Sequence, residues 1–142
     1  MKRIFAFLIL FVCLSIYAIS QEATQWRGVN SSGIYTVEKL LPQWPVDGPR
    51  ILWSYDKLGQ GYSSPAFANN KIYINGMANE QAVLFILDME GKELQQIKYG
   101  KEFDASYPGV RSTPTIVGDL AYLLTGHGIL TCLNLKTGNP VW

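Results

Sequence analysis

The stretch SSPAFANNKIYI at residues 63–74 returns as STPTIVGDLAYL at residues 112–123. Pro65 of the first stretch recurs as Pro114 of the second, 49 residues later. A period of this length is typical of architectures in which each repeat buries its faces against its neighbours. The chain is therefore predicted to hold two tandem copies of one structural unit.

The second half of each copy repeats as well, with VLFILDMEGKEL at residues 83–94 and ILTCLNLKTGNPVW at residues 129–142. Here Gly91 recurs as Gly138, 47 residues later. Only the length of an internal loop differs between the copies.

Each copy reads as short strands joined by tight turns. Asn69-Asn70 in the first copy and Gly118-Asp119 in the second are residues that tolerate the positive φ of hairpin turns. The flanking strands are therefore expected to be antiparallel neighbours.

The apolar pattern predicts how these strands are covered. Ile72 and Ile74 alternate with more polar positions, whereas residues 82–87 form a continuous apolar run, as in a strand covered on both faces. A period of 45 to 50 residues with four strands favours an all-β fold, a β-propeller of four-stranded antiparallel blades. A flat solenoid and a two-sheet sandwich are the alternatives.

About two blades are expected, in copies at about residues 53–100 and 101–142, the second incomplete. Residues 21–52 form a loop-rich segment, and residues 51–55 are predicted to be the first strand. Propellers use about 4 to 8 blades. The sequence is therefore interpreted as the N-terminal piece of a longer product or as a truncated gene.

The N-terminal segment predicts export. Lys2 and Arg3 precede the apolar residues 4–17, and a small-x-small site favours cleavage after Ser20. We expect a signal peptide over residues 1–20 and a periplasmic or extracellular protein.

Two other readings of this segment fit less well. An uncleaved anchor needs roughly 20 apolar residues, and this run is shorter and contains Ser15 and Tyr17. A lipoprotein needs a small residue before Cys13, where Val12 stands. No transmembrane span is expected after cleavage.

The charge balance argues against a nucleic-acid-binding protein, and the cysteine content argues against an internal disulfide. The chain has 12 Lys and Arg against 11 Asp and Glu, and removal of Lys2 and Arg3 leaves 10 against 11. Such a balance gives no field that attracts nucleic acid. Only Cys132 remains after cleavage, so no internal disulfide is expected.

The repeat ends resemble a known family. LDMEGKEL at residues 87–94 and LNLKTGNPVW at residues 133–142 resemble the Ala-x-Asp-x-x-Thr-Gly-Lys-x-x-Trp signature of pyrroloquinoline quinone (PQQ) repeat propellers. The leader, with WRGVN at residues 26–30 and GPRILW at residues 48–53, is similar to the N-terminal block of exported members. The resemblance covers nearly all of residues 26–142.

This resemblance implies that the Trp closing each repeat docks between neighbouring blades. Trp142 matches that Trp directly, and Trp53 fits the same place before the first full copy. Gln95 stands at this position in the first copy, where a weaker contact between blades is expected.

The turn before each closing position carries Asp88 and Gly91 in the first copy and Asn134 and Gly138 in the second. Oxygen atoms of this kind can bind Ca²⁺, which needs a cluster of them. Each stands alone in its own copy, so a hydrogen bond that caps the turn is the favoured role.

The resemblance places the start of the innermost strand at a mouth of the central channel. Arg111 stands there, followed by Ser112 and Thr113, and its guanidinium could bind an anion bidentately. The favoured alternative is a structural Arg that ties one blade to the next through backbone carbonyls or a carboxylate such as Asp104.

Ser63 and Ser64 fall on the equivalent stretch of the first copy and are candidates to line the channel too. Serines near turns commonly bond only to local backbone groups. His127, in Gly126-His127-Gly128, has no second ligand nearby and is expected in an exposed loop. Cys132 lies on an apolar strand and is expected to pack as a small hydrophobe.

The sequence holds no nucleophile motif, phosphate loop or paired carboxylates. The predicted function is a non-catalytic scaffold that binds a protein partner or a small molecule at the channel mouth. The alternative is part of a PQQ-dependent alcohol or sugar dehydrogenase with PQQ and Ca²⁺ as cofactors. The resemblance implies a calcium-binding carboxylate and a catalytic Asp for such an enzyme, and neither has a matching motif here.

Overall fold

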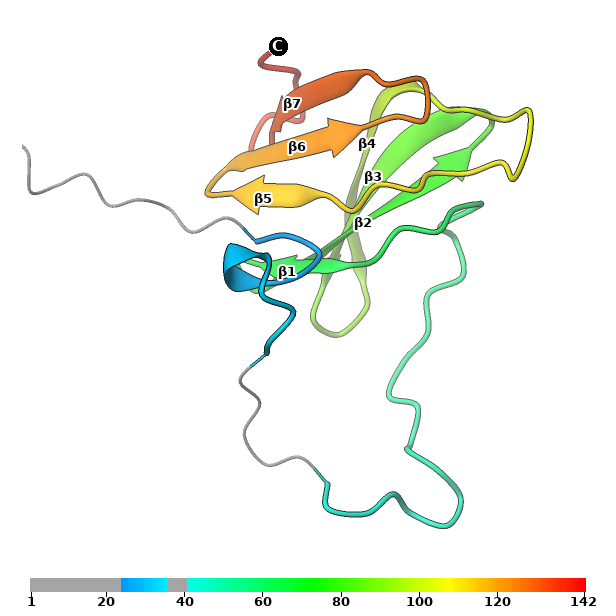
Figure 1. The fold of residues 1–142 in the computed structure, drawn as a ribbon, viewed down its shortest axis with the longest axis vertical. Helices are drawn as coiled ribbons and strands as arrows, with labels where there is room; N and C mark the ends of the chain where they lie inside the picture. Colours follow the sequence, from blue (N-terminus) through cyan, green and yellow to red (C-terminus); the bar gives the residue numbers. More distant parts are fainter. Residues whose placement is uncertain (1–23, 36–40) are drawn as a thin grey trace, which may run out of the picture.

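The computed structural model describes residues 24–35 and 41–142. The predicted signal peptide at residues 1–20 lies outside the described residues. The described part is all-β apart from a short 3-10 turn, η1 (Val29–Ser31). It forms two antiparallel sheets that lie next to each other (Figure 1).

The first sheet has four strands in the order β1-β2-β3-β4, and each strand pairs with the next in the chain. Asn69 and Asn70 form the β1–β2 turn with φ of 52° and 56°, which confirms the antiparallel turn predicted there. The strands are β1 (Ala66–Ala68), β2 (Lys71–Ala78), β3 (Gln81–Asp88) and β4 (Glu93–Lys101).

The second sheet has three strands in the order β5-β6-β7. Residues 139–142 begin to run along the outer side of β7, where Pro140 bridges to Leu133. The expected four strands are therefore found in the first sheet, and three in the second. These are β5 (Thr115–Val117), β6 (Leu120–Leu124) and β7 (Leu130–Asn134).

The core lies between the two sheets. Burial confirms the prediction for residues 82–87, all of which are buried, because both faces of β3 are covered. The alternation expected around Ile72 and Ile74 is wrong, since Tyr73 and Asn75 of β2 are buried as well. The core residues come from both sheets, among them Tyr73, Leu84, Ile97, Ile116, Leu123 and Leu133.

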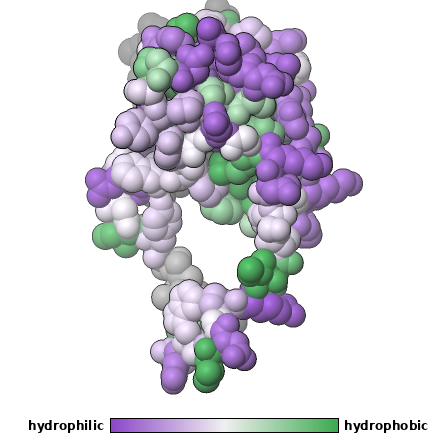
Figure 2. Space-filling model, turned by 90° about the vertical axis from the view of Figure 1, so that its right-hand side faces the viewer, coloured by the Kyte–Doolittle hydropathy of each residue, from purple (hydrophilic) through white to green (hydrophobic). Residues whose placement is uncertain are grey.

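The prediction for the segment before β1 is wrong as well. Residues 51–55 were expected to form a strand, but they pair with no strand among the described residues. Residues 41–50 loop away from the sheets (Figure 1), and Figure 2 shows this loop standing clear of the body of the molecule. Within residues 24–35 and 41–142 neither sheet closes into a ring.

Candidate functional site

The segments that lead into β1 and β5 lie side by side. Gly61 forms a parallel bridge with Val110, and the Tyr62 N–H donates to the Val110 carbonyl at 2.7 Å. Further along, the Ser64 N–H donates to the Thr113 hydroxyl at 3.2 Å. Equivalent positions of the two copies therefore meet at this edge, because the repeats stack in the same orientation.

The leader joins the same edge. Thr24 and Ile116 exchange two backbone hydrogen bonds of 2.8 Å, so the leader adds a short bridge to the open side of β5. The Tyr35 hydroxyl donates to the Trp26 carbonyl at 2.7 Å and holds the leader folded back on itself. This pairing sets Gln25 and Trp26 beside the inner strands.

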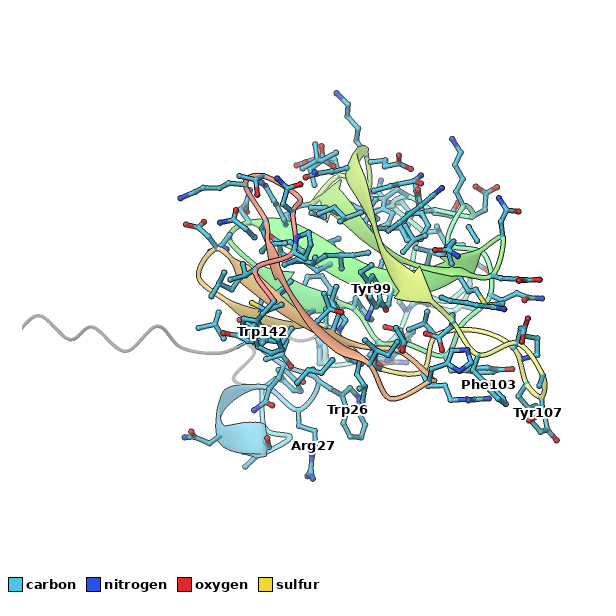
Figure 3. The ribbon with its side chains drawn as sticks, turned by 90° about the horizontal axis from the view of Figure 1, so that it is seen from above. Trp26, Arg27, Tyr99, Phe103, Tyr107 and Trp142 are labelled. Carbon is cyan, nitrogen blue, oxygen red and sulfur yellow. The ribbon has the colours of Figure 1, made fainter. Side chains whose placement is uncertain are left out.

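These three segments enclose an open hollow of about 350 Å³. Trp26 and Tyr62 are 63% and 62% exposed, so their rings are available to a ligand. Figure 3 shows Trp26 projecting from the leader. The hollow combines one cation, two aromatic rings, hydroxyl groups and an amide, contributed by Gln25, Trp26, Tyr62, Ser64, Arg111, Thr113 and Thr115.

Arg111 lines this hollow and is exposed. Its Nη2 donates to the carbonyls of Ser106 and Tyr107 at 2.9 and 2.7 Å, and its guanidinium lies 5.7 Å from the centre of the Phe103 ring. The carbonyl contacts are those of a structural Arg, made within the β4–β5 loop that carries Phe103 and Tyr107 (Figure 3). No carboxylate of the described residues comes within ion-pair distance of Arg111, so its charge has no counter-ion among them.

The predicted channel-mouth residues divide into two groups. Ser64 and Thr113 line the hollow together with Arg111. Ser112 does not, because its hydroxyl donates to the Leu124 carbonyl, and the Ser63 hydroxyl donates to the Ser64 carbonyl at 3.2 Å. The hydroxyl groups of Ser112 and Ser63 therefore bond to backbone carbonyls.

Sequence reasoning missed the residues that the leader and the β1 approach bring to the hollow. Gln25 and Trp26 are far from Arg111 in the chain, and only the Thr24–Ile116 pairing brings them near. Tyr62 and Thr115 were within reach of prediction, since Tyr62 directly precedes Ser63 and Thr115 stands two residues after Thr113.

The repeat residues hold turns and contacts between sheets. The Asp88 carboxylate accepts from the N–H groups of Glu90 and Lys92, and the side-chain oxygen of Asn134 accepts from those of Lys136 and Thr137. Both side chains therefore cap the turns in which they stand.

The residues at the position that closes each repeat contact a turn glycine or an aromatic ring. The Trp53 indole donates to the Met89 carbonyl at 3.1 Å, and a Cβ on Gly91 would meet its ring at 2.5 Å. Gln95 lies against Gly138 of the second sheet. Trp142 lies 6.2 Å from the ring of Tyr122 and is 60% exposed.

A buried polar cluster lies between the sheets. Glu102 is fully buried, and its Oε1 accepts from the N–H groups of Phe103 and Gly126. Asn75 donates to the Ser112 carbonyl at 3.0 Å. No sequence motif marked this cluster.

Tyr99 belongs to the same cluster and lies in the interior (Figure 3). Burial, reinforced by the nearby Glu102 carboxylate, raises the pKa of Tyr99, so its hydroxyl stays protonated. In the described part of the chain the Tyr99 hydroxyl and Glu102 Oε2 have no hydrogen-bond partner.

A tyrosine and a carboxylate are paired on the opposite face of the first sheet. The Tyr55 hydroxyl donates to the Glu93 carboxylate, and the Tyr55 ring packs edge-on against Phe85 with centroids 6.1 Å apart. Burial and the bond to Glu93 raise the pKa of Tyr55 to about 12, and the same bond lowers the pKa of Glu93.

His127 is exposed in the β6–β7 hairpin, where it packs edge-on against Phe103, and Cys132 is buried in β7. Among residues 24–35 and 41–142 no three His, Cys, Asp or Glu side chains gather as metal ligands. Nor does this part of the chain contain a helix with the length and apolarity that crossing a membrane requires.

Comparisons of the chain with models of protein families, with curated proteins and with solved structures found no match.

Proposed function

We propose that this chain is a non-catalytic binding module of an exported propeller of the PQQ-like type, and that the hollow holds an acidic segment of a partner protein. The repeated stretch, with equivalent positions stacked in parallel at one edge, supports a blade arrangement. The observation that carries the binding role is that Arg111 lines the same hollow as the exposed Trp26 and Tyr62.

The chemistry of the hollow favours an anion beside an apolar group. A guanidinium pairs with a carboxylate through parallel hydrogen bonds, and aromatic rings add contact area at small entropic cost. The hydroxyls of Ser64 and Thr113 and the amide of Gln25 can bond to a peptide backbone. An extended acidic segment with an aromatic side chain uses all three features.

The hollow fits PQQ with Ca²⁺ less well. Its Arg and aromatic rings suit a flat, carboxylated cofactor, but none of the residues that line it is a carboxylate. Ca²⁺ takes 6–8 oxygen ligands and depends on carboxylates for affinity. The donor set of this hollow therefore favours a binding module over a quinoprotein dehydrogenase.

The test is an NMR titration of the ¹⁵N-labelled chain, expressed with its own N-terminal segment. The probe is the capped peptide Gly-Phe-Glu-Phe-Gly, with the Gln analogue as its control. We expect amide shifts at Ser64, Arg111 and Thr113 with the Glu peptide, and an affinity at least fivefold weaker for the Gln peptide.

Variants separate charge from geometry. Arg111→Gln should abolish the shifts, Arg111→Lys should weaken them, and Arg50→Gln, an exposed Arg outside the hollow, should leave them unchanged. If the peptide causes no shift while PQQ with Ca²⁺ binds and supports dye reduction with alcohols or sugars, the binding-module proposal is overturned in favour of the dehydrogenase.

A further inference from the structure

Residues 25–35 fold into a loop that is held by its own hydrogen bonds, and we call this segment the leader loop. The Gly33 N–H donates to the Arg27 carbonyl at 2.9 Å. The Tyr35 hydroxyl reaches back to the Trp26 carbonyl and donates to it at 2.7 Å. Both bonds join the two ends of the loop, so its shape is set within the leader itself.

Two glycines allow side chains of the leader loop to pack on its backbone. Gly28 and Gly33 have positive φ of 68° and 69°, which residues with a side chain rarely adopt. A Cβ on Gly28 would lie 3.1 Å from the Tyr35 ring, and a Cβ on Gly33 would lie 3.3 Å from the Arg27 guanidinium. Tyr35 therefore contacts the loop through its ring as well as through its hydroxyl.

The leader loop sets the direction of an aromatic ring at the hollow. Trp26 lines the hollow and is 63% exposed, so burial does not hold its ring in place. The backbone around Trp26 is fixed on one side by the bridge between Thr24 and Ile116, and on the other by the bond from Tyr35. The direction of Trp26 therefore depends on the hydroxyl of Tyr35.

The same loop orients an amide at the hollow. The Gln25 Nε2 donates to the Ser31 hydroxyl at 2.9 Å. An amide has one acceptor oxygen beside its two donor hydrogens, so this bond leaves Oε1 of Gln25 to accept a hydrogen bond from a ligand. An extended peptide presents backbone N–H groups that suit such an acceptor.

The cation and the aromatic ring of the hollow are thus positioned by different segments. Arg111 is held by the carbonyls of Ser106 and Tyr107 in the β4–β5 loop, 2.9 and 2.7 Å from its Nη2. Trp26 and Gln25 are held by bonds within the leader loop. A change confined to the leader loop should therefore alter the contacts to an aromatic side chain and leave the charge of Arg111 in place.

We propose that the leader loop makes the hollow selective for a segment with an aromatic side chain next to its acidic one, and that Tyr35 is the positioning residue. The inference rests on the proposed binding of an acidic segment at the hollow. Trp26 packs against the aromatic ring of that segment, and Gln25 accepts a hydrogen bond from its backbone. Because the loop is already folded, ordering an exposed Trp costs less on binding.

A pair of peptides measures this selectivity. Capped Gly-Phe-Glu-Phe-Gly and Gly-Ala-Glu-Ala-Gly are titrated into the native chain and into Tyr35→Phe, and binding is followed at the amides of Arg111 and Thr113. The native chain should bind the Phe peptide about fivefold more tightly than the Ala peptide, from the contact between aromatic rings. In Tyr35→Phe this preference should fall to about twofold or less, while the affinity for the Ala peptide stays the same.

The variant keeps the ring that packs on Gly28 and removes only the bond to Trp26. Tyr35 is 61% exposed, so the variant should fold. Trp26→Ala should lose the preference as well. Tyr122→Phe, which removes a hydroxyl from a tyrosine outside the hollow, is the matched control and should keep it.

A preference for the Phe peptide that survives in Tyr35→Phe or in Trp26→Ala overturns the inference. If those variants still discriminate between the Glu peptide and its Gln analogue, the proposed function holds without it. A native chain that binds neither the Phe nor the Ala peptide overturns both.

A lower affinity of Tyr35→Phe for the Ala peptide, equal to its loss for the Phe peptide, also overturns the inference. Such a result would mean that Tyr35 supports the whole hollow and not the aromatic contact.

Discussion

The side-chain amide of Gln95 lies against the backbone of Gly138, where a Cβ would be 3.1 Å from Nε2. The same relationship is made by Trp53 with Gly91 ahead of the first sheet. A flat, large ring covers a turn better than an amide because it buries more apolar surface.

Gln95→Trp is therefore expected to stabilise the chain by about 1 kcal/mol through added apolar burial. Thermal unfolding followed by circular dichroism measures the change. Lys98→Trp, on the exposed side of β4, is the control and should leave the midpoint unchanged. A lower midpoint for Gln95→Trp would show that the space beside Gly138 does not accept an indole.

Gly91→Ala is expected to destabilise the chain more than Gly48→Ala. Both glycines have positive φ, 83° and 78°, so both substitutions should cost about 1 kcal/mol from backbone strain. Only Gly91 also has the Trp53 ring against it, which adds about 1–3 kcal/mol from overpacking, whereas nothing lies within 4 Å of a Cβ on Gly48. Urea denaturation of the two variants compares them, and equal losses would contradict the Trp53 contact.

Glu102→Ala is expected to cost about 1–3 kcal/mol, because it leaves the part-buried N–H groups of Phe103 and Gly126 without their acceptor. Glu102→Gln keeps an acceptor oxygen and should cost less. Glu80→Ala is the matched control, since Glu80 is exposed and its 3.7 Å ion pair with Lys101 should contribute less than about 1 kcal/mol. Free energies of unfolding from urea denaturation measure these costs. A loss for Glu102→Ala no larger than that for Glu80→Ala would show that the hydrogen bonds accepted by Glu102 do not stabilise the fold.

Tyr55→Phe is expected to change how folding stability depends on pH, at both acidic and alkaline pH. The pKa of Tyr55 in the folded chain is raised from 10.0 to about 12. The contribution of its hydroxyl to folding stability is therefore complete below pH 10 and is lost as the pH rises toward 12. The folded pKa of Glu93 is lowered from 4.5, so its contribution is present above that value and is lost as the pH falls through the folded pKa.

The Phe variant removes the hydrogen bond between Tyr55 and Glu93. Its stability should therefore depend less on pH than that of the native chain, at both acidic and alkaline pH. Urea midpoints measured from pH 3 to pH 12 test this. Tyr73 and Tyr99 also have raised pKa values, so some alkaline loss should persist in the variant. Identical pH profiles for the native chain and the variant would mean that the Tyr55–Glu93 bond contributes nothing.

Much of the local structure followed from short-range chemistry. Asn69 and Asn70 adopt positive φ because their side chains tolerate it, and Asp88 caps its turn because its carboxylate reaches the N–H groups of Glu90 and Lys92 just ahead. Such interactions depend on near neighbours in the chain, and a sequence displays them directly.

The candidate site was predicted in part. Arg111 and Thr113 were named from the family resemblance and Ser64 from the repeat, whereas Gln25 and Trp26 reach the hollow through a bridge between Thr24 and Ile116. No periodicity marks a pairing between an irregular leader and a strand edge.

The sequence by itself determined the repeat, its period and the antiparallel hairpins, because turn chemistry and apolar patterning act over a few residues. Only the tertiary structure decided that residues 51–55 pair with no strand of the described part of the chain and that Glu102 is buried. It also decided that the leader borders the hollow beside Arg111. Pairing and burial depend on which distant surfaces meet, and that is fixed by the stacking of the two sheets and not by any local stretch of the chain.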